Sequence, residues 1–150
     1  MSQENVELVR ALLPQPDTDW SLLIRDDDIF EQMREAVGPL FTDDFQSVMV
    51  WPAVNRTYAG LEGLRRNWLD WLEPWATYRI TIDELIDAGE RVVVLSRNYG
   101  RRKDMESEVE LIAAATLTFK EGKIARWEDY ADRAAALEAA GLAKDARTSS

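Results

Sequence analysis

The sequence predicts an α+β domain in which a curved, mostly antiparallel sheet wraps around N-terminal helices. Two observations predict this class. Apolar residues recur at helical spacing in the first part of the chain, whereas four consecutive stretches between residues 78 and 131 are rich in β-branched and aromatic residues. A run of antiparallel strands after early helices packs those helices on one face of the sheet. A sheet curved in this way leaves a concave hollow, where small ligands commonly bind.

The N-terminal part contains two predicted helices. Apolar residues at helical spacing mark the first between residues 5 and 13, and Pro14 ends it because proline lacks the N–H that a helix interior needs. The second follows three aspartates at 26–28 and ends at Gly38-Pro39. We favour helix capping over a divalent-cation site for these aspartates, because carboxylates at a helix start accept its free N–H groups and suit its dipole.

The middle of the chain begins with a predicted strand at 45–51. A turn-rich segment from Pro52 to Gly60 follows it. Residues 61–73 have helical spacing and precede Pro74, which disfavours further helix. We therefore expect the order strand, turn, helix here.

Four extended stretches follow, at 78–86, 91–100, 108–120 and 123–131. The links at 87–90 and 120–123 contain glycine and are short enough for hairpin turns, whereas the link at 101–107 is longer and charged. Asp132 then caps a last helix, which Gly141 ends. We expect residues 1–142 to form a single domain and residues 143–150 a flexible C-terminal tail.

The composition excludes several functional classes. The chain has 150 residues, 46% of them hydrophobic, which fits one domain with one core. It carries 18 basic against 28 acidic residues, so nucleic acid is not an expected partner. No apolar run is long enough for a membrane span, the first residues lack signal-peptide features, and there is no cysteine. We therefore expect a cytoplasmic protein without a membrane partner.

The chain contains no histidine, which excludes catalytic triads built on histidine and the common histidine metal sites. No glycine-rich phosphate loop is present either. We therefore expect neither a metal nor a cofactor. Acid–base chemistry in this protein must use carboxylates, tyrosine, lysine or bound water.

Four segments together resemble a known family. Residues 122–132, with the sequence Gly-Lys-Ile-Ala-Arg-Trp-Glu-Asp-Tyr-Ala-Asp, resemble the last strand of SnoaL-like and limonene epoxide hydrolase-like proteins. Residues 58–64, 87–94 and 136–142 resemble the turn into the third helix, the central hairpin and the closing segment of the same proteins. The chain thus resembles the nuclear transport factor two-like superfamily. That resemblance implies a cone-shaped fold with a pocket, and a homodimer.

The resemblance also implies site residues. In limonene epoxide hydrolase, the Asp of a last-strand Trp-x-Asp-Tyr motif is catalytic, and it matches Asp129. An Arg-x-Asp pair on a middle strand matches Arg97 and Tyr99, so the Arg is kept and the Asp is replaced. The Tyr and Asn that hold the attacking water match Ser47 and Met49. The resemblance therefore implies a related pocket rather than the same hydrolysis.

Strand alternation suggests how these residues meet. Trp127 and Asp129 share one face of their strand, and Arg97 and Tyr99 share one face of theirs. If both faces point into the hollow, Asp129 moves a proton, Arg97 sets its charge state and Tyr99 donates a hydrogen bond. The alternative is a buried Asp129–Arg97 ion pair that only fixes strand register.

An aromatic wall is the second predicted part of the site. We expect substrate contacts from Trp127, Trp68, Trp71, Trp51, Ser47 and Met49. A flat or cyclic apolar ligand suits such a lining, although core packing also explains some of the tryptophans.

The leading functional hypothesis is a cofactor-independent isomerase, cyclase or hydrolase that acts on a small apolar cyclic substrate through carboxylate chemistry. The alternative is a non-catalytic module that binds a hydrophobic ligand or dimerises. Pairing through the outer sheet face would use Ile112, Ala114 and Thr116, which are small or apolar. We expect a homodimer.

Overall fold

The computed structural model describes residues 2–13, 15–51 and 54–142 of the chain. Its helices are α1 (Ser2–Leu12), α2 (Trp20–Arg25), α3 (Asp27–Val37), α4 (Gly60–Leu72) and α5 (Arg133–Ala139), with a 3-10 turn, η1 (Gly38–Leu40), after α3. Its strands are β1 (Phe41–Trp51), β2 (Val54–Ala59), β3 (Trp75–Ala88), β4 (Arg91–Arg102), β5 (Glu108–Lys120) and β6 (Lys123–Tyr130). The predicted stop at Pro14 and the predicted tail at 143–150 lie outside the described residues.

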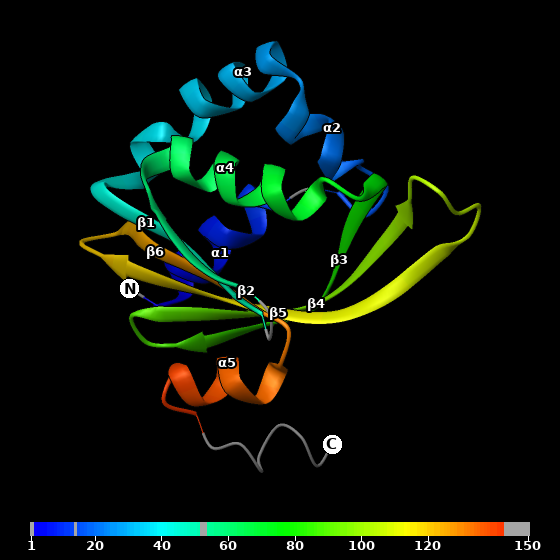
Figure 1. Cartoon of the computed structure of the whole chain (residues 1–150). Helices are drawn as coiled ribbons and strands as arrows, with labels where there is room; N and C mark the ends of the chain where they lie inside the picture. The colour runs from blue at the N-terminus through cyan, green and yellow to red at the C-terminus, as the bar shows by residue number, and fades with distance from the viewer. Residues whose placement is uncertain (1, 14, 52–53, 143–150) are drawn as a thin grey trace.

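The six strands form one curved, unclosed sheet in the order β2-β1-β6-β5-β4-β3. Neighbouring strands are antiparallel except β1 and β6, which run parallel. Figure 1 shows α2, α3 and α4 on the hollow side of the sheet and α5 alone on the opposite side. Val6 and Val9 place α1 in the core on the hollow side, together with Val92 and Val94. The predicted α+β class, with a curved sheet around N-terminal helices, is therefore confirmed.

Aspartates begin three of the helices. The carboxylates of Asp19, Asp26 and Asp132 accept hydrogen bonds from the backbone N–H groups of Ser21, Ile29 and Ala134. Each bond satisfies one N–H that the helix itself leaves free. The structure thus bears out capping at Asp26 and Asp132, which the sequence predicted.

Two elements differ from the sequence-based expectation. The segment predicted as turn-rich contains strand β2, which pairs with β1 from Gln46 to Trp51. Thr57 and Tyr58 favour such an extended conformation. Helix α2 was not predicted, because its six residues are too few to establish a helical period.

Helix α5 covers a patch on the convex face of the sheet. Ala136 and Leu137 of α5 pack there on a small second core that includes Val93, Leu95 and Ala114. Of the outer-face positions predicted to form a dimer contact, Ala114 is thus buried within the chain. Thr116 is buried as well, and its hydroxyl donates to the carbonyl of Ala136 at 3.5 Å.

Ile112 keeps 45% of its surface exposed. The predicted dimer surface is corrected accordingly, because α5 occupies most of it. The homodimer itself stays a prediction. Among the described helices, none is long and apolar enough to cross a bilayer.

Candidate functional site

A narrow cavity of about 40 Å³ lies on the concave side of the sheet, where side chains from α2, α4 and strands β1 and β3 to β6 meet. Six of the residues singled out in the sequence line it: Met49, Trp51, Trp68, Trp71, Trp127 and Asp129. The four tryptophans of the predicted aromatic wall thus lie around one space, and their contact with a substrate stays a prediction. Ser47 lies deeper, fully buried, and its hydroxyl accepts a hydrogen bond from Asn67 Nδ2 at 3.2 Å.

Small side chains on β5 make room for the cavity. Ala115 lies between Asp129 of β6 and Val94 of β4, and Ala113 pairs with Ser96 of β4. Side chains alternate along a strand, so Ala113 and Ala115 face the hollow while Ala114 faces α5. Larger residues at the two inward positions would fill the space beside Asp129.

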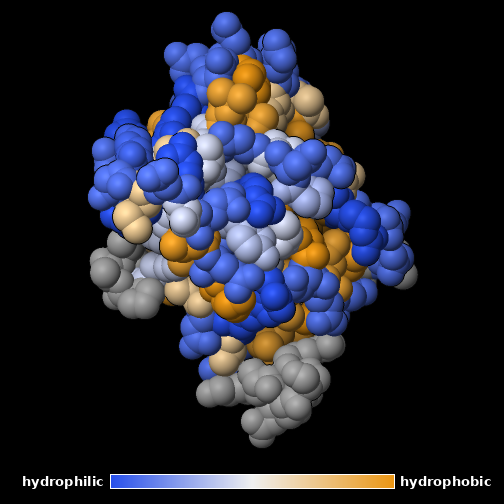
Figure 2. Space-filling model, turned by 90° about the vertical axis from the view of Figure 1, so that its right-hand side faces the viewer, coloured by the Kyte–Doolittle hydropathy of each residue, from blue (hydrophilic) through white to orange (hydrophobic). Residues whose placement is uncertain are grey.

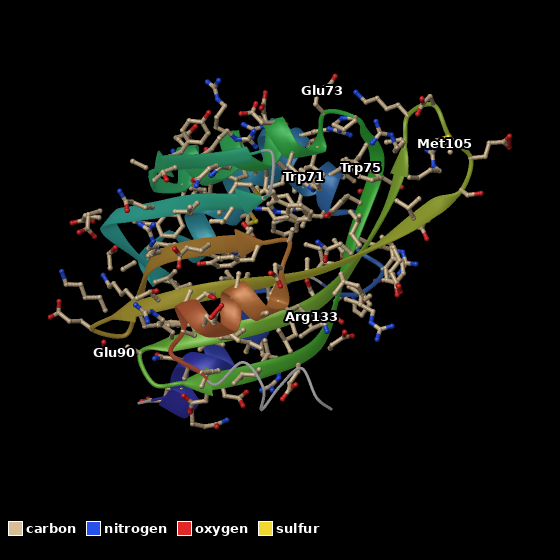
Figure 3. The ribbon with its side chains drawn as sticks, turned by 60° about the horizontal axis from the view of Figure 1, so that its bottom comes forward. Trp71, Glu73, Trp75, Glu90, Met105 and Arg133 are labelled. Atoms are coloured by element: carbon tan, nitrogen blue, oxygen red, sulfur yellow. The ribbon has the colours of Figure 1, made fainter. Side chains whose placement is uncertain are left out.

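Five tryptophans form another part of the wall: Trp20, Trp51, Trp68, Trp71 and Trp127. Trp20 packs edge to face on Trp68 with ring centroids 5.5 Å apart, and Trp51 lies 4.4 Å from Trp71. Figure 3 shows Trp71 and Trp75 close together at one end of the sheet, where their centroids are 6.3 Å apart. A cavity of this volume holds water molecules. A ring-shaped ligand needs more room than this, so side chains of the cavity lining must move to admit one.

Among the described residues, Asp129 is the one carboxylate that lines this cavity. Its Oδ1 accepts a hydrogen bond from Trp127 Nε1 at 3.3 Å, whereas its buried Oδ2 has no hydrogen-bond partner among residues 2–13, 15–51 and 54–142. Burial raises the pKa of Asp129 to about 7, and the Trp127 hydrogen bond acts in the opposite direction. A carboxyl with this pKa exchanges a proton readily at neutral pH.

Three indole N–H groups around the cavity are also unpaired. The Nε1 atoms of Trp20, Trp51 and Trp68 are buried and have no acceptor in the part of the chain that the structure describes. Buried polar atoms in folded proteins are nearly always hydrogen-bonded, so each exception calls for a reason. Four unpaired polar atoms around one space, counting Asp129 Oδ2, indicate a place where a ligand or water supplies the missing partners.

Two polar residues of β4, Ser96 and Asn98, also line the cavity, and Asn98 is hydrogen-bonded to Tyr78 of β3. Ser96 Oγ donates to Asn98 Oδ1 at 3.1 Å, and Asn98 Nδ2 donates to Tyr78 Oη at 2.9 Å. Burial raises the pKa of Tyr78 to about 12, so its hydroxyl keeps its proton at neutral pH. The sequence-based site did not include these residues or Trp20. Ser96 and Asn98 alternate with Arg97 and Tyr99, so this end of the strand is polar on both faces and its sequence does not mark the inward pair.

Arg97 and Tyr99 lie on the opposite face of the sheet. Arg97 Nε donates to Asp83 Oδ2 at 3.0 Å, and 49% of the Arg97 side chain is exposed. Tyr99 Oη donates to Glu110 Oε2 at 3.0 Å. Because Ser96 and Asn98 point into the hollow, residues 97 and 99 must point out. The predicted catalytic association of Asp129 with Arg97 and Tyr99, and the alternative of an Asp129–Arg97 ion pair, are therefore corrected.

Comparison with known protein families agrees with the fold described above. Residues 27–127 match the model of the SnoaL-like domain. The chain belongs to the SnoaL-like domain family. This match does not single out the limonene epoxide hydrolase branch that the last strand resembles. No curated protein sequence matches this SnoaL-like chain.

Solved structures show the same fold. A candidate SnoaL-like polyketide cyclase from Jannaschia sp. CCS1 is 18% identical, with a TM-score of 0.63 over 85% of this chain and 84% of that one. A ketosteroid isomerase-like protein from Catenulispora acidiphila, solved with trimethylamine, is 22% identical, with a TM-score of 0.56 over 89% and 97%. TerC, crystallised with polyporic acid, is 20% identical, with a TM-score of 0.62 over 92% and 98%. At these identities the likeness concerns the fold.

Proposed function

We propose that this SnoaL-like protein is a cofactor-independent enzyme in which Asp129 moves a proton to and from a small cyclic substrate. One observation carries the proposal: the carboxyl of Asp129 lies in an apolar cavity with one oxygen unpaired. None of the described arginines or lysines forms an ion pair with it. Burial alone therefore makes it a stronger base than an exposed carboxylate.

The proton transfer needs both forms of Asp129. As a carboxylate it removes a carbon-bound proton, and the electrons of that bond move into the substrate. As the acid so formed, it returns the proton to the same carbon or to another one. A pKa near neutral pH keeps both forms accessible. Isomerisation needs both halves of this step. In a cyclisation the carbanion attacks a carbonyl carbon of the same molecule, and Asp129 returns the proton to the resulting alkoxide oxygen.

Hydrolysis also needs a group that holds the attacking water. The positions that match the water-holding Tyr and Asn of limonene epoxide hydrolase are changed here: Met49 has no hydrogen-bond donor, and the Ser47 hydroxyl is bonded to Asn67. We therefore propose isomerase or cyclase chemistry first, with hydrolysis by another water position as the alternative. Two structural neighbours support a small-molecule site of this kind, since one is described as a candidate polyketide cyclase and the other was crystallised with polyporic acid.

The second candidate is a ligand-binding module without chemistry. The tryptophan lining favours it, because aromatic walls hold flat apolar molecules whether or not a base is present. The two candidates differ in one respect: only the enzyme needs the charge of Asp129.

A substrate-independent probe separates them. 5-Nitrobenzisoxazole opens to a coloured cyanophenolate when a base removes the proton from its ring carbon and the ring N–O bond breaks. We expect a rate that rises with pH through about 7, because the carboxylate is the active form. Asp129→Asn should lower it by on the order of a hundredfold. Asp83→Asn, the same change on the other face of the sheet, should leave it unaltered.

Two outcomes contradict the enzyme proposal. An Asp129→Asn variant as fast as the parent protein would remove Asp129 from the chemistry. A parent protein that binds ring compounds without opening the probe would favour the binding module. The homodimer is a separate proposal, and light scattering tests it by distinguishing one chain of 17.2 kDa from two.

A further inference from the structure

The side-chain amide of Asn98 is held rigidly in the cavity wall. Asn98 is 5% exposed and lines the same cavity as Asp129. Its carbonyl oxygen accepts from Ser96 Oγ at 3.1 Å, and its nitrogen donates to Tyr78 Oη at 2.9 Å. Both partners are themselves buried. The amide is therefore fixed on two sides before any ligand arrives.

One N–H of this amide is left over. An asparagine nitrogen carries two hydrogens, and the contact with Tyr78 uses one of them. Turning the amide over would exchange its two partners, with the nitrogen donating to Ser96 and the oxygen accepting from Tyr78, and would still leave one N–H. Within the described residues no further acceptor lies against it. A buried donor without an acceptor is costly, and an acceptor in the cavity removes that cost.

Asn98 and Asp129 lie on different strands of the cavity wall. Asp129 is on β6 and Asn98 on β4, with β5 between them. Neighbouring strands are about 4.8 Å apart, and each strand rises about 3.3 Å per residue. Asn98 pairs with Leu111 and Asp129 with Ala115, so their backbones are separated by about 10 Å across the strands and by about 13 Å along them. A ligand that reaches both side chains extends along β5 over Ala113 and Ala115. Its two ends then meet different chemistry, an acid–base group at one and a neutral donor at the other.

We propose that Asn98 binds a carbonyl or similar acceptor oxygen of the ligand, and that Ser96 and Tyr78 position its amide. The site then takes an oxygenated cyclic molecule in preference to a plain hydrocarbon of the same shape. This inference rests on the cavity being the ligand site of the proposed function, and it does not require that Asp129 performs chemistry.

The indole N–H groups of Trp20, Trp51 and Trp68 are the competing donors. They are unpaired as well. The Nε1 atoms of these tryptophans have no hydrogen bond that holds the rings in one orientation. Asn98 stays in place because its partners and its strand hold it. A preorganised donor contributes more to binding than one that must be ordered on binding.

The test uses two probes of nearly equal shape, acetophenone and α-methylstyrene, in which a carbonyl oxygen replaces a CH₂ group. Ligand-observed NMR titration at about pH 8 gives both dissociation constants. At that pH Asp129 is mainly a carboxylate and cannot donate to the ketone. We expect the parent protein to bind acetophenone about tenfold more tightly, as one hydrogen bond allows.

Asn98→Leu removes the amide with little change in volume and should abolish this preference. Asn67→Leu is the matched control, because Asn67 is also a buried asparagine but does not line the cavity. It should keep the preference whatever its effect on melting. Ser96→Ala should reduce the preference partly, since it loosens the amide and leaves the donor. Trp68→Phe removes one competing donor and should keep the preference.

The outcomes separate this inference from the proposed function. A preference that survives Asn98→Leu, or that is lost in Trp68→Phe instead, overturns the role of Asn98 even if Asp129 opens the benzisoxazole. Loss of the preference in Asn98→Leu alone upholds the role of Asn98, even if no proton transfer is found. Equal binding of the two probes by the parent protein also overturns it.

Discussion

The two faces of the sheet shift the pKa of an aspartate in opposite directions. On the concave face, Asp129 is surrounded by tryptophans and alanines, and burial raises its pKa to about 7. On the convex face, burial also acts to raise the pKa of Asp83, but hydrogen bonds from Arg133 and Arg97 outweigh it and hold that pKa below its usual value. Figure 3 shows Arg133 at the start of α5.

This difference separates chemistry from structure. A carboxylate with two guanidinium partners is stable as an anion and has little reason to take up a proton. A buried carboxylate without a cation gains from protonation or from a ligand. The convex face therefore uses charge to hold α5 in place, while the concave face keeps a carboxyl poised for reaction.

The largest expected effect comes from Asp129→Asn. The unfolded chain titrates this group near 3.8 and the folded chain near 7, so the folded state binds more protons between these values. The free energy of unfolding of the parent protein thus falls as pH rises through this window, by about 4 kcal/mol at most. The variant lacks this loss and should be more stable than the parent at about pH 8, with the difference vanishing towards pH 4.

Urea denaturation of both proteins at several pH values measures this difference. The Asp83→Asn variant serves as the control with the opposite sign. In the parent protein, the interaction of Asp83 with Arg133 and Arg97 stabilises the fold above the pKa that Asp83 has in the unfolded chain. This stabilisation is lost as pH falls through the lower pKa of Asp83 in the folded chain. An Asp129→Asn variant less stable than the parent at about pH 8 would mean that a cation compensates Asp129 after all.

Arg133 should show the next largest effect. Its guanidinium donates to Asp83 Oδ2 at 2.7 Å and to the carbonyls of Ser96 and Ala113 at 2.7 and 3.2 Å. Arg133→Met removes these three hydrogen bonds and frees the start of α5. We expect a loss of about 2–3 kcal/mol in the free energy of unfolding. Hydrogen exchange in α5 should accelerate, whereas an unchanged rate would show that apolar packing alone holds the helix.

Two neighbouring alanines on β5, Ala114 and Ala115, allow the same substitution to be compared on the two faces of the sheet. Ala114→Val adds volume beneath α5, where Ala136 and Leu137 already fill the space, and should reduce stability by about 1–2 kcal/mol without altering ligand binding. Ala115→Val fills part of the cavity instead. It should change stability by less than about 1 kcal/mol and weaken acetophenone binding. If melting and titration experiments gave the reverse pattern, Ala114 would face the cavity and Ala115 would face α5.

Arg97→Gln should have the smallest effect. The Arg97 side chain is half exposed, and Asp83 keeps Arg133 as a partner when Arg97 is changed. We expect less than about 1 kcal/mol in stability and no change in benzisoxazole opening. A rate loss of tenfold or more would show that Arg97 does take part in proton transfer by Asp129.

Local signals explain why much of the fold and part of the site were predictable. Helical spacing, capping aspartates and hairpin glycines act over a few residues, so the order of the main elements follows from the sequence. Trp127 and Asp129 were placed together correctly because they lie two positions apart on one strand. Their common face needs no knowledge of the rest of the sheet.

The orientation of β4 was the part that the sequence did not reveal. Val92 and Val94 face the main core, while Val93 and Leu95 face α5, so both faces of this strand are apolar. A strand covered on both sides has no alternation from which its inward face can be read. Arg97 was therefore assigned to the cavity, and Ser96 and Asn98 were missed for the same reason.

The surface around the projecting β4–β5 hairpin differs from both faces of the sheet, because few large apolar side chains lie on it. Figure 2 shows this side of the molecule as mainly hydrophilic, with smaller hydrophobic areas. Met105 and Val109, near the tip, are among the few large apolar side chains that remain exposed. Scattered exposed residues of this kind are normal on soluble proteins and indicate no partner by themselves.

The parallel pairing of β1 with β6 has a consequence for how the protein comes into being. Gln46 and Arg126, whose side chains meet at 2.6 Å across this pair, are 80 positions apart in the chain. During synthesis β1 leaves the ribosome long before β6 exists, and its inner edge stays unpaired in the meantime. Contacts between distant segments also form slowly in refolding. The cavity beside Met49 and Asp129 is therefore among the last parts of the molecule to assemble, and mutations in β6 should reduce the yield of folded protein as well as its activity.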